Sequence, residues 1–285
     1  MLIFTIGCMG LLTSLTAAVG MIEKEEKEHF SLSAWEDFLK KSPVSALFSP
    51  SFEERKESFL VQKQMLITQY MLTHKVARLD LLSDHAIHEL SRKIRQLFID
   101  IILDYSVKDQ HIHAFFADSV PLSKIDASIY HQIKYHVPAS IKLAQAALET
   151  GYGKKVIGNN YFGMKAKNDK SNTQTTYEYY TEKEFESYKE KILDFERVKQ
   201  NGKTIYKCRV RDNFVSYASA WESFVAHSEY LASHARYAPL FAKGKNYKAW
   251  AEKIGSTKYG GVGYATSPLY GQLLKNIIEK YHLYL

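Results

Sequence analysis

The chain has 285 residues, of which 46% are hydrophobic and 24% charged, with 20 Tyr beside 15 Phe and 3 Trp. This composition excludes a disordered chain and allows one large packed domain with an accessory segment. The formal net charge of +7 favours an anionic partner. Because Lys and Arg alternate with Asp and Glu, and no zinc-finger or RNA-binding signature occurs, we expect no nucleic-acid partner.

Residues 1–20 contain no charged side chain. A helix of twenty apolar residues is about 30 Å long, which is enough to cross a bilayer. The segment also fits a cleaved signal peptide, with Ala18-Val19-Gly20 as the cleavage site, although no Lys or Arg precedes the apolar run. The sequence therefore predicts export to the cell envelope and leaves signal peptide and membrane anchor as alternatives.

The two cysteines, Cys8 and Cys208, are far apart and belong to different kinds of segment. They form no disulfide framework, no metal-type cluster and no redox motif, so we expect neither a metal nor another cofactor. Cys208 is more typical of a small apolar strand residue than of a nucleophile.

Charged and proline-containing residues 21–51 are predicted to be a linker, with one short helix at Trp35 to Lys40. Residues 52–120 are predicted to be a helical accessory region, because the apolar residues from Phe52 to about Tyr105 recur at three- and four-residue steps; no helix is recognised between Tyr105 and residue 120. The run Asp118-Ser119-Val120-Pro121 marks a break before the last region, residues 121–285.

Region 121–285 combines helical and strand patterns. Residues 123–152 are helical, with Pro138 in a first turn and Gly151 where a left-handed cap would end the helix. Residues 172–217 alternate as strands do, and Asn201-Gly202 indicates a tight hairpin. Helical patterns return in the segments Trp221 to Leu231, Tyr247 to Ile254 and Leu269 to Tyr281. The prediction is a mainly α protein with a small inserted β-hairpin lobe, preceded by an N-terminal helical region.

Glu149 is the acidic residue with the clearest chemical setting. It occupies the last turn of a helix of small and apolar residues, and the negative end of the helix dipole and partial burial both raise the pKa of a carboxyl group. A carboxylic acid that is protonated near neutral pH can protonate a leaving oxygen. The glycines at positions 151 and 153 leave room for a polymer beside it.

The stretch around Glu149 resembles the signature of the glycoside hydrolase family 73 glucosaminidases, relatives of the flagellar muramidase domain and of staphylococcal-type autolysins. The similarity lies in AQAALETGYG at 144–153 and NNYFGMK at 159–165, followed in order by WESF at 221–224 and YATSPLY at 264–270. It covers approximately Ile133 to Leu285.

The resemblance implies a lysozyme-like helical domain with a β-lobe along a glycan cleft. It also implies an endo-β-N-acetylglucosaminidase, which cleaves the β-1,4 bond after N-acetylglucosamine in the glycan strands of peptidoglycan. By the resemblance, Glu149 is the catalytic acid, Glu178 in Thr-Thr-Tyr-Glu-Tyr is the second acidic residue, with one residue inserted relative to the family, and Tyr264 lies near the reaction centre. The substrate-binding residues expected on the same basis are Gln145, Tyr152, Asn160, Phe162 and Tyr237.

Two departures from the family pattern and several alternatives remain. Tyr152 stands where the family more often has Trp, and Ser267 stands where Asp is commoner.

The second step of the reaction proceeds either through the substrate's acetamido group or through water activated by Glu178, which needs carboxyl groups roughly 6.5–9.5 Å apart. The rival functions are a lytic transglycosylase of lysozyme-like fold and a non-catalytic wall-binding assembly protein. We further expect residues 21–120 to be dispensable for the chemistry.

Overall fold

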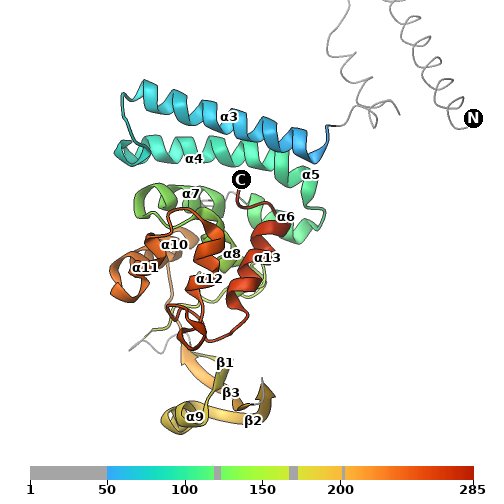
Figure 1. Cartoon of the computed structure of the whole chain (residues 1–285), viewed down its shortest axis with the longest axis vertical. Coiled ribbons are helices and arrows are strands. Elements are labelled where there is room, and N and C mark those ends of the chain that lie inside the picture. The colour runs from blue at the N-terminus through green and yellow to red at the C-terminus, as the bar shows by residue number, and fades with distance from the viewer. Residues whose placement is uncertain (1–49, 119–122, 167–172, 201–202) are drawn as a thin grey trace, which may run out of the picture. The chain divides into compact units, whose positions relative to one another are not determined.

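The computed structural model describes residues 50–118, 123–166, 173–200 and 203–285 (Figure 1). Met1–Arg55 and Lys56–Leu285 form two separate units. The predicted apolar segment 1–20, most of the linker 21–51 and the turn Asn201-Gly202 lie outside the described residues. Among the helices that are described, none has the length and the apolar content that crossing a membrane requires.

The helical prediction for residues 52–105 is confirmed. The elements are α3 (Phe52–Thr73), a 3₁₀ turn (Leu79–Leu81), α4 (Asp84–Phe98), a π-helical turn (Ile99–Leu103) and α5 (Asp104–Ser106). The Ser83 hydroxyl caps α4 by accepting a hydrogen bond from the Ala86 N–H at 3.2 Å. The buried residues of α4 follow its helical period: Ala86, Ile87, Leu90, Ser91, Ile94 and Phe98.

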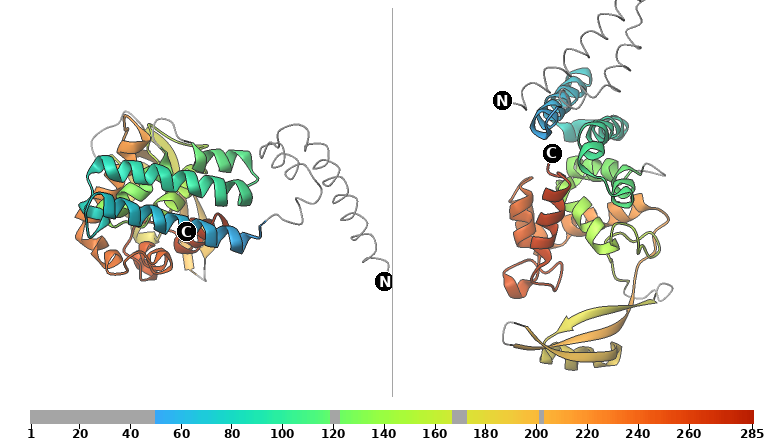
Figure 2. Two further views of the ribbon diagram at one scale, coloured as in Figure 1. Left: turned by 90° about the horizontal axis from the view of Figure 1, so that it is seen from above. Right: turned by 90° about the vertical axis from the view of Figure 1, so that its right-hand side faces the viewer.

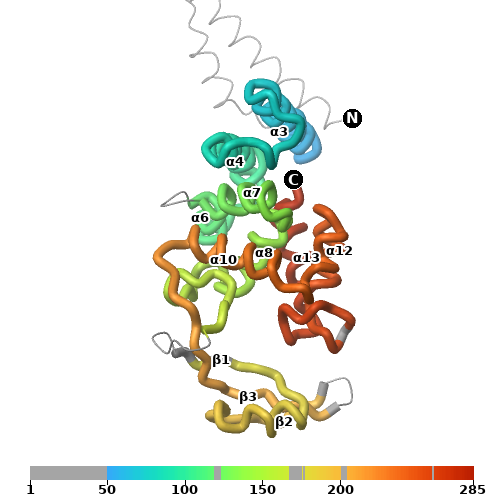
Figure 3. The backbone as a smooth tube through the Cα atoms, turned by 90° about the vertical axis from the view of Figure 1, so that its left-hand side faces the viewer, coloured from blue at the N-terminus to red at the C-terminus, as the bar shows by residue number. Residues whose placement is uncertain are grey.

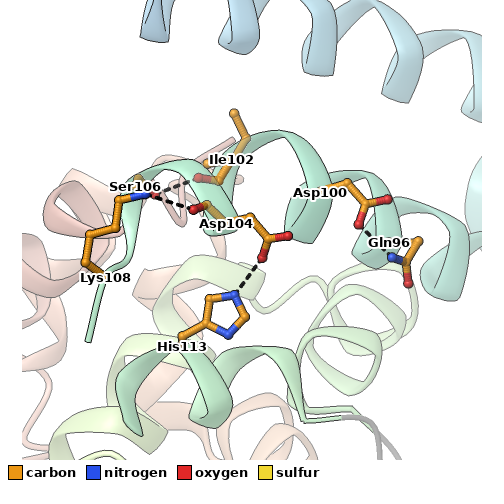
Figure 4. A network of polar contacts seen from close by, with 7 residues as sticks. All are labelled: Gln96, Asp100, Ile102, Asp104, Ser106, Lys108 and His113. Carbon is orange, nitrogen blue, oxygen red and sulfur yellow. Dashed lines mark hydrogen bonds and ion pairs between the residues drawn. The ribbon is translucent and has the colours of Figure 1, made fainter. Parts of the chain in front are cut away.

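Helix α6 (Gln110–Ala117) was not predicted from the sequence. Asp109 caps it by accepting hydrogen bonds from two backbone N–H groups at 3.0 and 3.1 Å. His113 on α6 lies 2.7 Å from the carboxylate of Asp104 on α5, in the polar network drawn in Figure 4. The chain between the two helices is tied in the same network, because the Lys108 ammonium donates to the Asp104 carbonyl at 3.2 Å.

The second half of the chain supplies a further group of helices. They are α7 (Lys124–Tyr135), α8 (Ala139–Thr150), α10 (Ala220–Ser233), α11 (Ala238–Phe241), α12 (Tyr247–Ile254) and α13 (Tyr270–Lys280), with 3₁₀ turns at Ala235–Tyr237 and Thr257–Tyr259. Helix α7 packs against α4, α8 and α10, and α8 also packs against α12 and α13. Every residue of α8 from Ser140 to Ala147 is buried. A helix buried on all sides holds its end residues in a fixed place.

A three-stranded antiparallel sheet forms a lobe, which the right-hand view of Figure 2 shows apart from the helices. Its order is β1-β3-β2, and the elements are β1 (Thr173–Tyr180), α9 (Glu182–Tyr188), a 3₁₀ turn (Lys189–Lys191), β2 (Ile192–Gln200) and β3 (Lys203–Asn213). The core of the lobe contains Phe185 from α9 and Tyr206, Cys208 and Val210 from β3. The predicted mainly α fold with a small β-lobe is confirmed.

Two details of the lobe differ from the prediction. The sheet has a third strand beyond the β2–β3 hairpin, and α9 interrupts the segment predicted to be entirely strand. The helix forms because Thr181 and Glu184 make a capping box: the Thr181 hydroxyl accepts from the Glu184 N–H, and the Glu184 carboxylate accepts from the Thr181 N–H. The residues on either side alternate as in a strand, so the capping box was not recognised in the sequence.

An ion pair joins the accessory helices to the second half of the chain. Arg95 on α4 donates to the carboxylate of Asp126 on α7 at 3.0 Å, and the two side chains are 14% and 3% exposed. Burial raises the pKa of Asp126 to about 6, against the opposing charges of Arg95 and Arg92. The boundary predicted at residue 120 lies within the unit Lys56–Leu285 and stays a prediction.

Replacing Arg95 by Met should cost about 3–5 kcal/mol of unfolding free energy at pH 7.5, because the buried Asp126 carboxylate loses its partner. The folded-state pKa of Asp126 should then rise further above its unfolded value. A carboxyl with a raised folded-state pKa destabilises the fold once it ionises, so the deficit relative to wild type should shrink as the pH falls from 7.5 toward the wild-type pKa of about 6, and it should stay constant at lower pH.

Urea unfolding of wild type and variant across that pH range measures the effect. Arg78→Met is the matched control, because Arg78 pairs with Asp80 at the surface with its own side chain 69% exposed, and its loss should cost at most about 1 kcal/mol. A deficit of Arg95→Met that did not change with pH would contradict the assignment to Asp126.

Candidate active site

Glu149 lies in the last turn of α8, where the helix leaves the core. Gly151 ends the helix with φ +56°, as predicted. Glu149 is exposed to solvent, yet burial raises the pKa of its carboxyl to about 7, and the charge of Glu178 acts in the same direction. The exposure is that of the residue as a whole, whereas the pKa shift reflects the protein packed around the carboxyl group itself.

Tyr270, the first residue of α13, holds one oxygen of this carboxyl. Its buried hydroxyl donates to Glu149 Oε1 at 2.9 Å and accepts from Gln145 Nε2 at 3.0 Å. Gln145 is one helical turn before Glu149 on α8 and is fully buried. The hydrogen bond from Tyr270 stabilises the charged carboxylate and so partly offsets the effect of burial on the pKa of Glu149.

The second oxygen of Glu149 faces the glycine of the Asn-Asn-Tyr-Phe-Gly segment. Gly163 has φ +63°, and a β-carbon at this position would stand 3.6 Å from Glu149 Oε2. Glycine therefore suits this position for two reasons, since it adopts the left-handed conformation without strain and adds no side chain next to the carboxyl.

The Asn159-Asn160 pair fixes the segment that carries Gly163. The Asn160 amide donates to the carbonyls of Met164 and Val215 at 2.8 and 3.1 Å, and its oxygen accepts from the N–H groups of Phe162 and Met164. The Asn159 amide donates to the carbonyls of Tyr217 and Ala218. Asn160 thus uses its whole hydrogen-bonding capacity within the protein. In Figure 3 this segment lies between α6 and the sheet.

Tyr264 lies in the second layer of aromatic rings around Glu149. Its hydroxyl donates to the Phe162 carbonyl at 3.2 Å, and its ring centroid is 5.8 Å from that of Tyr270. Burial and the charge of Glu149 raise the pKa of Tyr264. The structure therefore brings Tyr264 and Glu149 into one region.

Four of the five predicted substrate-binding residues have almost no exposed surface: Gln145 (0%), Tyr237 (1%), Phe162 (3%) and Asn160 (5%). Phe162 stacks on His227 with ring centroids 3.9 Å apart. The Tyr237 hydroxyl accepts from Arg236 at 2.6 Å. Residues this deeply buried support the site from within, and their expected contact with substrate stays a prediction.

Tyr152, the fifth residue, is partly exposed but packs away from the rings around Tyr264. It forms edge-to-face contacts with Phe115 of α6 and with Tyr281 beyond α13, at centroid distances of 6.0 and 5.8 Å. Its φ is +58°, and the glycines on both sides, at 151 and 153, are also left-handed. Three such residues in a row turn the chain sharply just after Glu149.

Glu178 lies on β1, and its side chain is 20% exposed. Lys165 pairs with Glu178 at 2.9 Å and with Asp212 of β3 at 2.7 Å. Burial opposes the charge of Lys165, but the hydrogen bonds and charges of the two carboxylates outweigh this effect and raise its pKa. The Glu178 carboxylate is thus held in an ion pair with Lys165 and is not free in solvent.

The other three glutamates near Glu178 have separate partners. Glu182 accepts from the Tyr206 hydroxyl at 3.3 Å, Glu184 completes the capping box of α9, and Glu186 pairs with Lys189. Of these four glutamates, only Glu178 contributes to the pKa shift of Glu149.

The sequence interpretation missed three residues of this site: Tyr270, Lys165 and Asp212. Tyr270 and Lys165 belong to the YATSPLY and NNYFGMK motifs, so their place in those motifs was an available signal. Asp212 had no local signal, because its proximity to Lys165 arises only when β3 pairs with β1. Within the described part of the chain, no group of three or more His, Cys, Asp or Glu could hold a metal ion.

Comparison with known proteins extends the sequence resemblance. Exo-glucosaminidase LytG of Bacillus subtilis is 30% identical over 158 residues, which are 53% of this chain and 46% of that protein. The chain thus spans about half the length of this relative. The catalytic domain of the autolysin Auto from Listeria monocytogenes is 23% identical, with a TM-score of 0.41, over 62% of this chain and 88% of that one.

A peptidoglycan hydrolase mutant from Sphingomonas sp. A1 is 24% identical, with a TM-score of 0.38, over 60% of this chain and 94% of that one. The profile of the glucosaminidase family, described as mannosyl-glycoprotein endo-beta-N-acetylglucosaminidase, matches residues 126–283. This match takes in Glu149, the Asn-Asn segment, the β-lobe and Tyr264 to Tyr270. Since it extends over more than half of the chain, the protein belongs to the glucosaminidase family.

Proposed function

We propose that the chain is a peptidoglycan hydrolase that cleaves the β-1,4 bond after N-acetylglucosamine within glycan strands, with Glu149 as the general acid. The observation that carries this proposal is the setting of Glu149: the pKa of its carboxyl is about 7, the residue as a whole is exposed, and one carboxyl oxygen is held by Tyr270. A general acid works best when its pKa lies near the operating pH.

In the proposed first step, protonated Glu149 donates its proton to the glycosidic oxygen as the bond from that oxygen to the anomeric carbon breaks. Positive charge then develops on the sugar ring. The leaving sugar departs as a neutral alcohol, and Glu149 is left as a carboxylate. The Tyr270 hydroxyl, already directed at Oε1, stabilises this charged form.

Glu178 is our candidate for the second carboxyl. It would take a proton from the water whose oxygen attacks the anomeric carbon. Its electrostatic effect on Glu149 and its fixed position beside Lys165 support this role. In the alternative route the substrate's 2-acetamido group stabilises the positive carbon, and Glu178 only adjusts the charge around Glu149.

A lytic transglycosylase remains the second candidate, because it needs the same kind of acid. It acts on muramic acid and leaves anhydro ends without consuming water. Glu178, a second carboxyl that acts electrostatically on the first, favours hydrolysis. Mass spectrometry of fragments released from purified sacculi distinguishes the two reactions by the mass of the new sugar end, and it also distinguishes internal cleavage from release of terminal sugars.

This function requires that the protein act in the cell envelope on glycan strands. We propose export on that ground, with residues 1–20 as the exporting segment and residues 121–285 as the glucosaminidase domain. Attachment to the membrane through residues 1–20 remains a proposal that fractionation of cells would test.

Glu149→Gln should lower hydrolysis of purified sacculi by at least about 100-fold, because the amide keeps the shape of the side chain but has no acidic proton. Release of soluble fragments measures the rate, and circular dichroism reports whether the variant is folded. Glu229→Gln, an exposed glutamate on α10, is the matched control and should keep wild-type activity. A folded Glu149→Gln protein with near wild-type activity would remove Glu149 as the acid.

Tyr270→Phe should move the alkaline limb of the pH–activity profile to higher pH. The wild-type limb is expected near pH 7, because activity falls as Glu149 loses its proton. The hydrogen bond from Tyr270 lowers the pKa of Glu149, so its removal raises that pKa. Tyr247→Phe removes a hydroxyl that donates to Glu279 at 3.2 Å on α13, and it should leave the limb in place. A limb that did not move in Tyr270→Phe would count against this coupling.

Glu178→Gln should have the opposite effect on Glu149. The negative charge of Glu178 raises the pKa of Glu149, so its removal should lower that pKa, and a carboxyl ¹³C titration by NMR would measure it directly. If Glu178 is also the base, turnover should fall by about 100-fold or more. A normal rate with a lowered pKa would instead favour the acetamido route. Glu186→Gln, on the exposed side of α9, is the matched control.

A further inference from the structure

An open hollow of about 520 Å³ lies next to the turn that follows Glu149. Its wall on one side is α6, which is outside the segment that matches the glucosaminidase family. The other side consists of Tyr152, Gly153 and Tyr161. Tyr152 comes three residues after Glu149, and Tyr161 comes two residues before Gly163, where an added β-carbon would stand 3.6 Å from Glu149 Oε2. The side of the hollow opposite α6 is thus adjacent in sequence to residues beside the candidate acid.

The wall from α6 is tightly packed against the turn. A β-carbon on Gly153 would stand 3.2 Å from the ring of Phe115, so Gly153 allows the two segments to meet. Phe115 and Phe116 also pack edge-on against Tyr152. The hollow is therefore a fixed feature of the fold, because its wall and its floor support each other.

The hollow combines aromatic rings with a balanced pair of charges. The ammonium of Lys124 lies 4.9 Å from the ring centroid of Phe115 and 5.6 Å from that of Tyr161, and it pairs with Asp118 at 3.4 Å. The Lys124 side chain is 7% exposed, whereas that of Asp118 is 48% exposed. Burial lowers the pKa of Lys124, and Asp118 opposes this effect. A ligand thus meets partly exposed tyrosine rings and a carboxylate, with little net charge.

We propose that this hollow is a second binding site for the glycan strand, which holds sugar units beyond the bond that Glu149 cleaves. The inference rests on the proposed function and adds a role for the helices before residue 121. A sugar ring has apolar faces that pack on aromatic rings and hydroxyl groups that donate to a carboxylate. In this proposal, a strand bound at Glu149 continues past it into the hollow, which adjoins the turn after Glu149.

Blocking the hollow without removing any existing contact gives the sharpest test. Ala114 is an exposed residue of α6 that lines the hollow, so Ala114→Trp should fill the space while leaving the packing of α6 unchanged. Ala232→Trp, at an exposed position on α10, is the matched control. Both variants are assayed in the full-length protein on long peptide-free glycan strands and on a tetrasaccharide of the same sugars.

The expected result for Ala114→Trp is a loss of about tenfold in kcat/KM on the long strands, equivalent to about 1.4 kcal/mol, with less than about twofold change on the tetrasaccharide. Equal losses on both substrates, or no loss on either, would overturn the proposal. With intact sacculi as a third, peptide-bearing substrate, a loss that appeared only there would also overturn it, because the occupant would then be the peptide.

Binding separates failure of this inference from failure of the proposed function. In the Glu149→Gln background, which cannot turn over the strand by the proposed reaction, calorimetric titration with long strands should show affinity falling about tenfold on adding Ala114→Trp. If the wild type cleaves no strand but this affinity still falls, the hollow is a glycan site and the activity is wrong. If the wild type cleaves and the affinity does not fall, the activity stands and the hollow is not such a site.

Discussion

The arrangement of the site depends on the hydrogen bond from Tyr270 to Glu149. It joins the first residue of α13 to the last turn of α8, two helices that pack side by side in the core. Because Gln145 holds the Tyr270 hydroxyl from inside α8, the carboxyl is oriented by groups that are themselves buried and immobile. The same bond stabilises the ionised acid, while burial and Glu178 favour the protonated one. These opposing effects leave the pKa near neutrality.

The helices and the position of Glu149 could be predicted from the sequence because they depend on local patterns. The position of Glu149 at the end of a helix follows from a run of small and apolar residues closed by Gly151, and α12 has the predicted bounds, Tyr247–Ile254. Contacts over long separations could not be predicted in this way. Tyr270 is 121 residues from Glu149, and no local pattern fixes the angle at which α13 meets α8.

The buried motif residues explain a second limit of sequence interpretation. Phe162, Asn160 and Tyr237 belong to segments shared with the family, but a shared segment identifies residues that a site needs without indicating which of them meet the ligand. Asn160 is needed to hold the chain that places Gly163, and Phe162 supplies the carbonyl that holds Tyr264. The accessory helices α4 and α6 contact the second half of the chain through Arg95 and Phe115, contacts that the sequence did not indicate, and their dispensability for the chemistry stays a prediction.

The left-handed turn at Tyr152 has a consequence for which substitutions the protein tolerates. A side chain in this conformation costs about 1 kcal/mol, a cost that glycine does not incur. Glycine at position 152 would therefore relax the backbone, but it would remove the ring that packs between α6 and Tyr281. Substitutions at position 152 that are not under selection should thus keep the left-handed turn more often than the aromatic ring. If natural variants of the protein keep an aromatic residue at position 152, this indicates selection for the contact with α6.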